Sequence, residues 1–550
     1  MGMAAVCLLL LAGRATFLGT VQAGDLQARA EDQRRVPRVL PARRGSIVAR
    51  DGVALAAGQP ALLVTVDPAV IKDTVATANM LEPVLDRPAR QINEVLEKRS
   101  RWEVLDPSFD AGRREELERL DIPGLRLEDI EERFYPRGRV GAQVVGFTRD
   151  AGGRIEGIEG LEKELERHLA GTSGKRVELK DPFGNTLRVI EDEPPRPGTD
   201  VRVSLDSVFQ EYTEALLAGE RSRLGALSIT AIAMRPSDGA IYTMATVPRF
   251  DPNDRSQLDQ EAVKNRPVTD WLEPGSTFKI VAVAGALEEG LVTPDTSFVL
   301  PPKLVERFKG PFPPVTLRDS HTRGRVTWDV RTIMKKSSNI GVVKIAKRLS
   351  NADKLEYWIR RFGFGAQTGI DFPGESAGLV LPGEQWSGAS ILNIPIGQGI
   401  STTLVQMARA YAAIANGGSL VTPHFVTRVG DSPVDPEPGL RIMSKGTAHT
   451  MTGLLRGVVS DQGTGAQAKI PDYEVAGKTG TSNKIAPNGT YDKRRYWASF
   501  IGYLPADDPE LLIAVVVDEP KGSNVYGGQV AAPIFEKLAK FGINRLGISP

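Results

Sequence analysis

Two pairs of apolar segments with the pattern of β-strands lie far apart in the chain, and they restrict its fold more than any other feature. Residues 226–234 and 240–246 flank a turn sequence, RPSDG, and residues 498–505 and 510–519 are joined by a short loop. Each pair predicts two adjacent strands, and segments with helical patterns lie between the pairs. We therefore expect an antiparallel sheet that is assembled from both ends of this region and covers a block of helices.

The part of the chain before this region is rich in surface charge. Its clearest element is a predicted helix with Leu161, Leu165 and Leu169 on one face and Gly171 at its end. Residues 191–198, EDEPPRPG, are charged and proline-rich, which is typical of a linker. The sequence thus predicts an α+β protein in three parts: a membrane anchor at 1–23, a pedestal domain at 24–198 and a second domain at 199–550.

The N-terminus is apolar from residue 3 to residue 23, apart from Gly13 and Arg14. About 20 apolar residues suffice to span a bilayer, so this segment predicts an anchor in which Arg14 must reach the interface. The alternative is a cleaved signal peptide with Val21-Gln22-Ala23 at its cleavage site. We favour the anchor because the stretch after Arg14 is long for a cleavage region. Basic residues at 34–44 favour the opposite orientation, but a long domain can be exported regardless.

Composition excludes several classes of function. Lys plus Arg number 69 and Asp plus Glu number 68, and this net charge of +1 does not favour bulk capture of nucleic acid. Cys7 is the single cysteine, so neither an intramolecular disulfide nor a Cys-ligated zinc site can form. The four histidines lack the spacing of metal ligands. We therefore expect no metal, no cofactor and no nucleic-acid partner.

Ser276 and Lys279 lie in the segment EPGSTFKIVAVAGALEEG at 273–290. Pro274-Gly275 interrupts the chain just before Ser276, and Gly290 lies where a helix would stop, so we predict a buried helix between them. Positions i and i+3 share one helix face. Burial can lower a lysine pKa by up to ~3–5, and a neutral amine beside a hydroxyl is a general base. The alternative is a helix-capping serine and a lysine whose charge reaches solvent.

A second motif, KSSN at 336–339, precedes an apolar segment with a helical pattern. Ser337 can relay a proton, and the Asn339 amide can both donate and accept hydrogen bonds. Taken alone, this motif also fits a Ser/Asn helix cap.

A third motif, GKTGT at 477–481, follows a segment with a β-like pattern. Lys478 supplies positive charge, Thr479 and Thr481 supply hydroxyl donors, and Gly480 leaves room for a ligand backbone against the strand. This arrangement suits an extended peptide that ends in a carboxylate and binds by strand addition. Taken alone, it also fits a polar turn.

Ser-x-x-Lys, Ser-x-Asn and Lys-Thr-Gly in this order form the motif set of penicillin-binding proteins and class A β-lactamases. Over nearly its whole length the chain resembles the class B penicillin-binding proteins, D,D-transpeptidases of peptidoglycan synthesis. Within them it is most similar to the division-specific septal (FtsI-type) enzymes, and the elongation-specific enzymes are the alternative. The resemblance also rests on RRGSIVARDGVALA at 43–56, RFYPRGRVGAQVVGFT at 133–148, GIEGLEKELERHLAG at 157–171, GQG at 397–399 and YGGQVAAPIF at 526–535.

This resemblance implies a fold and a set of roles. The fold is a penicillin-binding transpeptidase domain, an antiparallel sheet flanked by helices, after an elongated α+β pedestal and a membrane anchor. Ser276 would attack the penultimate D-Ala carbonyl of a stem peptide, and Lys279 would take its proton. Ser337 and Asn339 would complete the proton network and hold Lys279. Lys478, Thr479 and Thr481 would hold the terminal carboxylate, and Gly480 belongs to the same substrate-binding segment. The backbone N–H groups of Ser276 and Thr481 would form the oxyanion hole.

The resemblance also implies partners and a location. The partners are peptidoglycan stem peptides, β-lactams, the membrane and division-machinery proteins that include a polytopic glycosyltransferase. The location is the bacterial inner membrane, with a single span and the catalytic domain in the periplasm.

Two other functions share the motifs. A class A β-lactamase fits less well, because the second motif is Ser-Ser-Asn and no Glu-x-x-Leu-Asn segment is present to activate a deacylating water. A non-catalytic penicillin sensor fits less well because all three motifs are intact.

Overall fold

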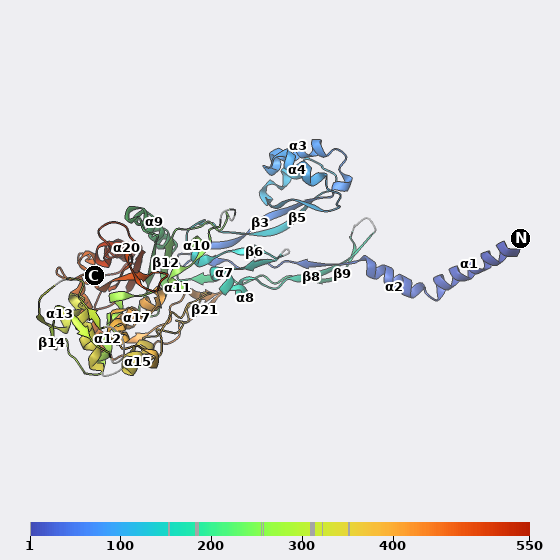
Figure 1. Ribbon diagram of the computed structural model, residues 1–550. Helices are drawn as coiled ribbons and strands as arrows, with labels where there is room; N and C mark the ends of the chain where they lie inside the picture. Colours follow the sequence, from blue (N-terminus) through green and yellow to red (C-terminus); the bar gives the residue numbers. More distant parts are fainter. Residues whose placement is uncertain are drawn as a thin grey trace.

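A long N-terminal helix projects from one end of the molecule, and a large α+β domain lies at the other (Figure 1). The computed structural model describes residues 2–151, 154–181, 186–254, 256, 258–308, 314–321, 323–349 and 352–550. Helix α1 (Gly2–Thr20) has a mean hydropathy of 1.7, none of it is buried, and among the described residues it is the one helix long and apolar enough to span a membrane. The apolar N-terminal segment is therefore helical, as predicted.

A narrow stalk follows the N-terminal helix. Helix α2 (Ala23–Arg34) leads into a three-stranded antiparallel sheet in the order β1-β8-β9, with bounds Arg35–Leu40, Gly174–Lys180 and Thr186–Glu193. The predicted linker at 191–198 is not a free connector. Its first three residues belong to β9, Arg196 pairs with Thr172, and the Gly198 N–H donates to the Arg43 carbonyl. The prolines end the strand, but the backbone beyond them stays bonded to the pedestal.

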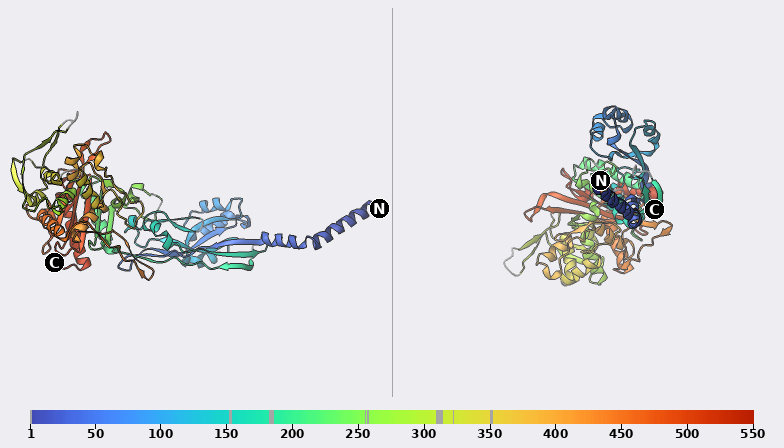
Figure 2. Two further views of the ribbon diagram at one scale, coloured as in Figure 1. Left: turned by 90° about the horizontal axis from the view of Figure 1, so that it is seen from below. Right: turned by 90° about the vertical axis from the view of Figure 1, so that its right-hand side faces the viewer.

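A second sheet joins the pedestal to the larger domain. Its strand order is β21-β20-β10-β2-β3-β4, and β5 also pairs with β3. A small lobe of helices packs on β3 and β4 and lies to one side of the long axis (Figure 2). The bounds are β2 (Ile47–Val48), β3 (Ala54–Val66), β4 (Glu103–Asp110), β5 (Leu125–Phe134), β10 (Val201–Val203), β20 (Val426–Val429), β21 (Ser432–Pro433), and in the lobe α3 (Thr74–Leu85), α4 (Ala89–Leu96) and α5 (Arg114–Glu118).

The predicted two-ended sheet is present in the larger domain. It is antiparallel and five-stranded, in the order β12-β11-β25-β24-β23, with bounds Ile241–Val247, Ser228–Met234, Leu511–Asp518, Tyr491–Leu504 and Ala476–Ile485. Its strands alternate between two cores, so that Ile229 and Val515 face one core while Ile232 and Val516 face the other. This alternation follows from the two-residue period of a strand.

Helices cover both faces of this sheet (Figure 1). Helices α9 (Ser207–Leu224) and α20 (Ala532–Leu546) pack on one face. The other face packs on a helical block that consists of α12 (Lys279–Glu288), α13 (Val330–Lys335), α14 (Asn339–Ala346), α15 (Ala352–Arg361), α17 (Leu404–Ala415) and α18 (Lys445–Val459). The result is the α+β arrangement that the sequence predicts.

The shorter elements lie mainly in connections. They are α6 (Ala142–Val145), β6 (Thr148–Asp150), β7 (Ile155–Gly157), α7 (Gly160–Glu164), α8 (Glu166–Leu169), α10 (Gln260–Val263), α11 (Arg266–Thr269), β13 (Trp271–Leu272), β14 (Ser297–Leu300), β15 (Leu304–Glu306), β16 (Val315–Leu317), β17 (Val326–Asp329), α16 (Ser390–Asn393), β18 (Thr402–Thr403), β19 (Ser419–Leu420), β22 (Leu440–Arg441) and α19 (Gly527–Val530).

Candidate active site

Ser276 lies in a single 3₁₀ turn, Gly275–Phe278, and α12 begins only at Lys279. The predicted helix thus starts three residues later than the sequence suggests. In a 3₁₀ turn, residues i and i+3 are eclipsed, so Ser276 and Lys279 are aligned more closely than on an α-helix. The turn begins at Gly275, whose φ of +58° is a left-handed conformation that favours glycine.

Neighbouring segments hold this turn in place. The Gly275 N–H donates to the Gly397 carbonyl at 3.0 Å, which ties the turn to the GQG segment. The Tyr411 hydroxyl, from α17, donates to the Thr277 carbonyl at 2.8 Å. The half-buried Ser276 side chain therefore projects from a fixed backbone.

Lys279 is fully buried, and its amine contacts the second motif directly. Its Nζ donates to the Ser337 carbonyl at 2.6 Å, to Ser337 Oγ at 3.1 Å and to Asn339 Oδ1 at 2.7 Å. Burial lowers the pKa of Lys279 to about 7, and the negative charge of Asp319 opposes this change in part. At neutral pH a large fraction of the amine is therefore unprotonated, and this neutral form can donate to at most two of the three acceptors.

Ser337 connects two lysines through one hydroxyl. Its Oγ accepts from Lys279 Nζ at 3.1 Å and from Lys478 Nζ at 2.8 Å, which uses both of its lone pairs. Its φ of +56° is unusual for a residue other than glycine. Burial, and then the proximity of Lys279, lower the pKa of Lys478 well below its ordinary value. The positive charge expected at Lys478 is thus disfavoured.

Within KSSN, Ser338 is the residue that caps the helix. Its Oγ accepts from the Gly341 N–H at 2.9 Å, just before α14 starts at Asn339. Asn339 accepts from Lys279, while its Nδ2 donates to the Arg318 carbonyl at 3.0 Å. The two interpretations of this motif therefore apply to different residues. Ser338 caps the helix, whereas Ser337 and Asn339 contact the Lys279 amine.

The third motif lies in β23, an edge strand of the five-stranded sheet. Thr479 Oγ1 lies 2.9 Å from Thr464 Oγ1, and Thr481 Oγ1 accepts from the Gly527 N–H at 3.1 Å. A Cβ on Gly480 would lie 3.0 Å from the Pro274 carbonyl oxygen, so this strand touches the Ser276 turn. All three motifs therefore meet in one place, and a strand edge is available beside them.

Three acidic or hydroxyl side chains at the site escaped sequence analysis. Asp319 accepts from Ser338 Oγ, and Thr464 lies beside Thr479. Glu273 is buried, and its Oε1 accepts from the Gly399 N–H at 2.7 Å. Of these three residues, only Glu273 could have been noticed in the sequence, because it lies in the same segment as Ser276. Asp319 and Thr464 come from loops without a motif.

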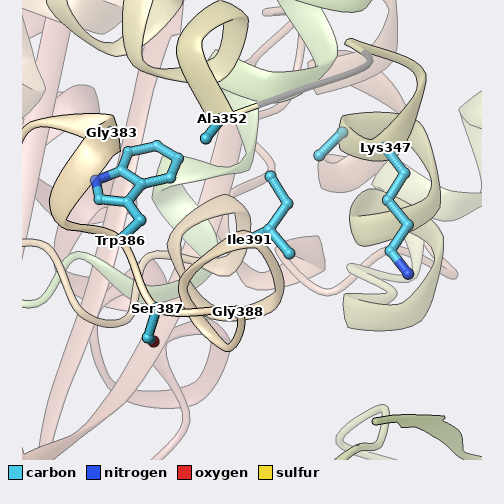
Figure 3. Close-up of a pocket in the computed structure, with 8 residues that line it drawn as sticks. Lys347, Ala352, Gly383, Trp386, Ser387, Gly388 and Ile391 are labelled. Atoms are coloured by element: carbon cyan, nitrogen blue, oxygen red, sulfur yellow. The ribbon is translucent and has the colours of Figure 1, made fainter. Parts of the chain in front are cut away.

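A cavity of about 290 Å³ lies elsewhere, between Lys347, Trp386 and Ile391 (Figure 3). None of its lining residues belongs to the three motifs. Within the described ranges, no cluster of three or more His, Cys, Asp or Glu side chains could hold a metal ion.

Two known protein families match most of this chain. The family model described as the penicillin binding protein transpeptidase domain matches residues 229–540, and that of the penicillin-binding protein dimerisation domain matches residues 39–203. Peptidoglycan D,D-transpeptidase FtsI of Escherichia coli K12 is 30% identical, with 99% of this chain and 91% of FtsI covered. Penicillin-binding protein PbpB of Mycobacterium tuberculosis is 31% identical, with 97% and 82% covered.

Solved structures show the same similarity. The crystal structure of penicillin-binding protein 3 from Mycobacterium tuberculosis in complex with aztreonam is 31% identical and superimposes with a TM-score of 0.72, with 93% of this chain and 98% of that chain covered. Penicillin-binding protein 2X from Streptococcus thermophilus, at 21% identity, shares the fold with a TM-score of 0.79. With two matching family models and relatives that cover nearly its whole length, this chain belongs to the class B penicillin-binding proteins of FtsI type.

Proposed function

We propose that the protein is a peptidoglycan D,D-transpeptidase that acts through an acyl-enzyme on Ser276. The observation that carries this proposal is the buried amine of Lys279, one eclipsed turn from Ser276 and bonded to Ser337 and Asn339. The FtsI relative is named for this activity. This function explains why Lys279 is buried and partly unprotonated: the proposed catalytic residues include no histidine, so the lysine amine serves as the base.

The proposed reaction assigns each of these groups a step. The neutral Lys279 amine takes the Ser276 proton as Oγ attacks the penultimate D-Ala carbonyl, and such a base contributes ~10²–10⁴-fold. Backbone N–H groups of Ser276 and Thr481 stabilise the oxyanion, each by about 3–4 kcal/mol. The leaving D-Ala amine takes a proton from the network through Ser337. An amine of a second stem peptide then attacks the ester and loses a proton to Lys279. The bond between the acyl carbon and Ser276 Oγ breaks, the cross-link forms, and Oγ regains the proton from Lys279.

Substrate would bind as an added strand along the open edge of β23. Its terminal carboxylate would lie against Lys478, Thr479 and Thr481, with Gly480 leaving space for its backbone. An anion beside Lys478 favours the protonated form of that amine. Substrate binding would therefore restore the charge that burial suppresses in the empty site.

A thioester analogue of a stem peptide ending in D-Ala, offered with a D-amino acid acceptor, tests this function. The wild-type protein should form the acyl-transfer product, Ser276→Ala should form none, and Ser432→Ala, on the exposed strand β21, should match the wild type. Product formation by Ser276→Ala would contradict the proposal. Rapid hydrolysis of penicillin by the wild type would instead indicate a β-lactamase.

We further propose that the enzyme works at the division septum, held by α1 as a single span of the inner membrane with its larger domain in the periplasm. Its partners there would be division-machinery membrane proteins, including a polytopic glycosyltransferase. The similarity to FtsI supports this. A fluorescently tagged copy should gather at the division site, whereas an even distribution along the lateral wall would favour an elongation-specific enzyme.

The division of the chain into an anchor at 1–23, a pedestal at 24–198 and a transpeptidase domain at 199–550 stays part of this proposal. Separate family models for the two larger parts support it. The sheet that contains both β2 and β10 implies that these two parts fold against each other.

A further inference from the structure

Asp319 follows β16 and lies outside all three motifs. Its carboxylate nevertheless accepts several hydrogen bonds at the site. Its side chain is 10% exposed. Both carboxylate oxygens accept from Ser338 Oγ at 3.0 Å, and Oδ1 also accepts from the Ile340 N–H at 3.1 Å. Arg323 Nε donates to Oδ2 at 2.8 Å. The carboxylate therefore binds the residues at the start of α14.

Arg318, the residue before Asp319, also binds the segment at the start of α14. The Arg318 carbonyl accepts from Asn339 Nδ2, whose partner atom Oδ1 accepts from Lys279. The Arg318–Asp319 segment thus fixes the two residues that follow Ser337. Since Ser337 and Asn339 supply the acceptors of the Lys279 amine, a shift of this segment would misplace them.

Charge adds a second effect, because few charged groups in the described part of the chain face the Lys279 amine. From β23 the neighbouring group is Lys478, and from the loop after β16 it is Asp319 with its partner Arg323; α14 contributes the uncharged Asn339. Lys336, the first residue of the KSSN motif, donates instead to the Gln462 carbonyl. Asp319 is therefore the carboxylate that favours the protonated amine, against burial and against Lys478.

We propose that Asp319 is a positioning residue of the transpeptidase: it holds the Ser337–Asn339 turn against Lys279 and sets the pH at which that amine becomes the base. This inference rests on the proposed function. According to this inference, the Arg318–Asp319 segment, which lies outside the three motifs, also controls acylation.

The test is the rate of acylation by a fluorescent penicillin, measured from pH 5.5 to 9 in the wild type and in Asp319→Asn. Asparagine keeps an acceptor for Ser338 but removes the charge, so the midpoint of the acidic limb should fall by roughly one pH unit. The plateau rate should also fall, by roughly 3–30-fold, because the turn is held less firmly. Asp329→Asn is the matched control, since Asp329 caps α13 but does not contact the turn.

An unchanged midpoint in Asp319→Asn, with the control also unchanged, would overturn the inference and leave the proposed function intact. Absence of acylation in the wild type would overturn both. If Asp319→Asn does not fold, Arg323→Gln decides. It removes the cation paired with Asp319, so the midpoint must rise, and a constant or lower midpoint would contradict the role.

Discussion

Lys279 and Lys478 donate to the same hydroxyl, and two buried ammonium groups this close repel each other. The site resolves the conflict by favouring the neutral form of at least one amine. This explains how a lysine can act as a base near neutral pH: burial removes the hydration that stabilises its charge, and Ser337 connects it to a second proton donor. Sequence spacing predicts the Ser276–Lys279 pair, but only the structure shows the shared hydroxyl.

The sign of the pH dependence follows from the pKa of Lys279, which burial lowers to about 7. In the proposed mechanism only the neutral amine accepts the Ser276 proton, so the acylation rate should rise with pH through about 7 and level off above it. Lys279→Ala should lower the plateau by roughly 10²–10⁴-fold. Lys445→Ala, at an exposed position of α18, should keep the wild-type profile. Stopped-flow fluorescence with a penicillin measures this, and a rate independent of pH between 5.5 and 8.5 would be contrary to it.

At the scale of elements, the site depends on the close approach of a strand to a turn. β23 lies against the Ser276 turn because Gly480 has no side chain: a Cβ there would lie 2.3 Å from Ser499 Oγ and 3.0 Å from the Pro274 carbonyl oxygen. The serine hydroxyl can rotate away, but the carbonyl belongs to the backbone. Gly480 therefore matters for packing as well as for ligand access.

Gly480→Ala should separate the strand from the turn. We expect a loss of about 1–3 kcal/mol in the free energy of unfolding and a marked fall in the acylation rate. Gly453→Ala is the control, because the added Cβ in α18 would have no atom within 4 Å apart from its immediate neighbours and its own helix backbone. It should stabilise the protein by about 0.5–1 kcal/mol and leave acylation unchanged. Thermal unfolding and penicillin labelling measure both effects, and equal behaviour of the two variants would refute this explanation.

Elements with strong local patterns were predictable. The apolar segments of β11, β12, β24 and β25 lie at the two ends of one region with helical patterns between them, and this arrangement predicts the sheet that they share. The pairing of β2 with β10 and of β10 with β20 was not predictable, because short strands with distant partners carry no local signal. The role of Asp319 could not be predicted for the same reason, because only the folded chain brings it next to its partners Ser338 and Ile340.

At the scale of the whole molecule, a buried ion network holds the pedestal together near its junction with the catalytic domain. Arg44 Nε and Arg133 Nε donate to the two carboxylate oxygens of Glu162, at 2.8 and 2.6 Å. The Glu162 side chain is 0% exposed. Arg44 also donates to Glu166 on α8 at 2.7 Å. The network joins the segment before β2, the strand β5 and the helices α7 and α8, which are far apart in the sequence.

Removal of one partner leaves buried charges uncompensated, so Glu162→Ala should lower the free energy of unfolding by about 3–5 kcal/mol. Glu164→Ala, an exposed neighbour on α7, should have little effect. Because the network lies outside the three motifs, the fraction of Glu162→Ala that stays folded should be acylated at the wild-type rate. Chemical denaturation measures the first effect and penicillin labelling the second. Wild-type stability of Glu162→Ala would show that the network is not structural.

The most direct test of the acyl-enzyme is to locate it. After incubation with a penicillin, intact-protein mass spectrometry should show one adduct per chain, and fragmentation of the tryptic peptide that ends at Lys279 should place it on Ser276. An adduct on any other residue, or no adduct together with rapid release of hydrolysed penicillin, would contradict the assignment of Ser276 as the nucleophile.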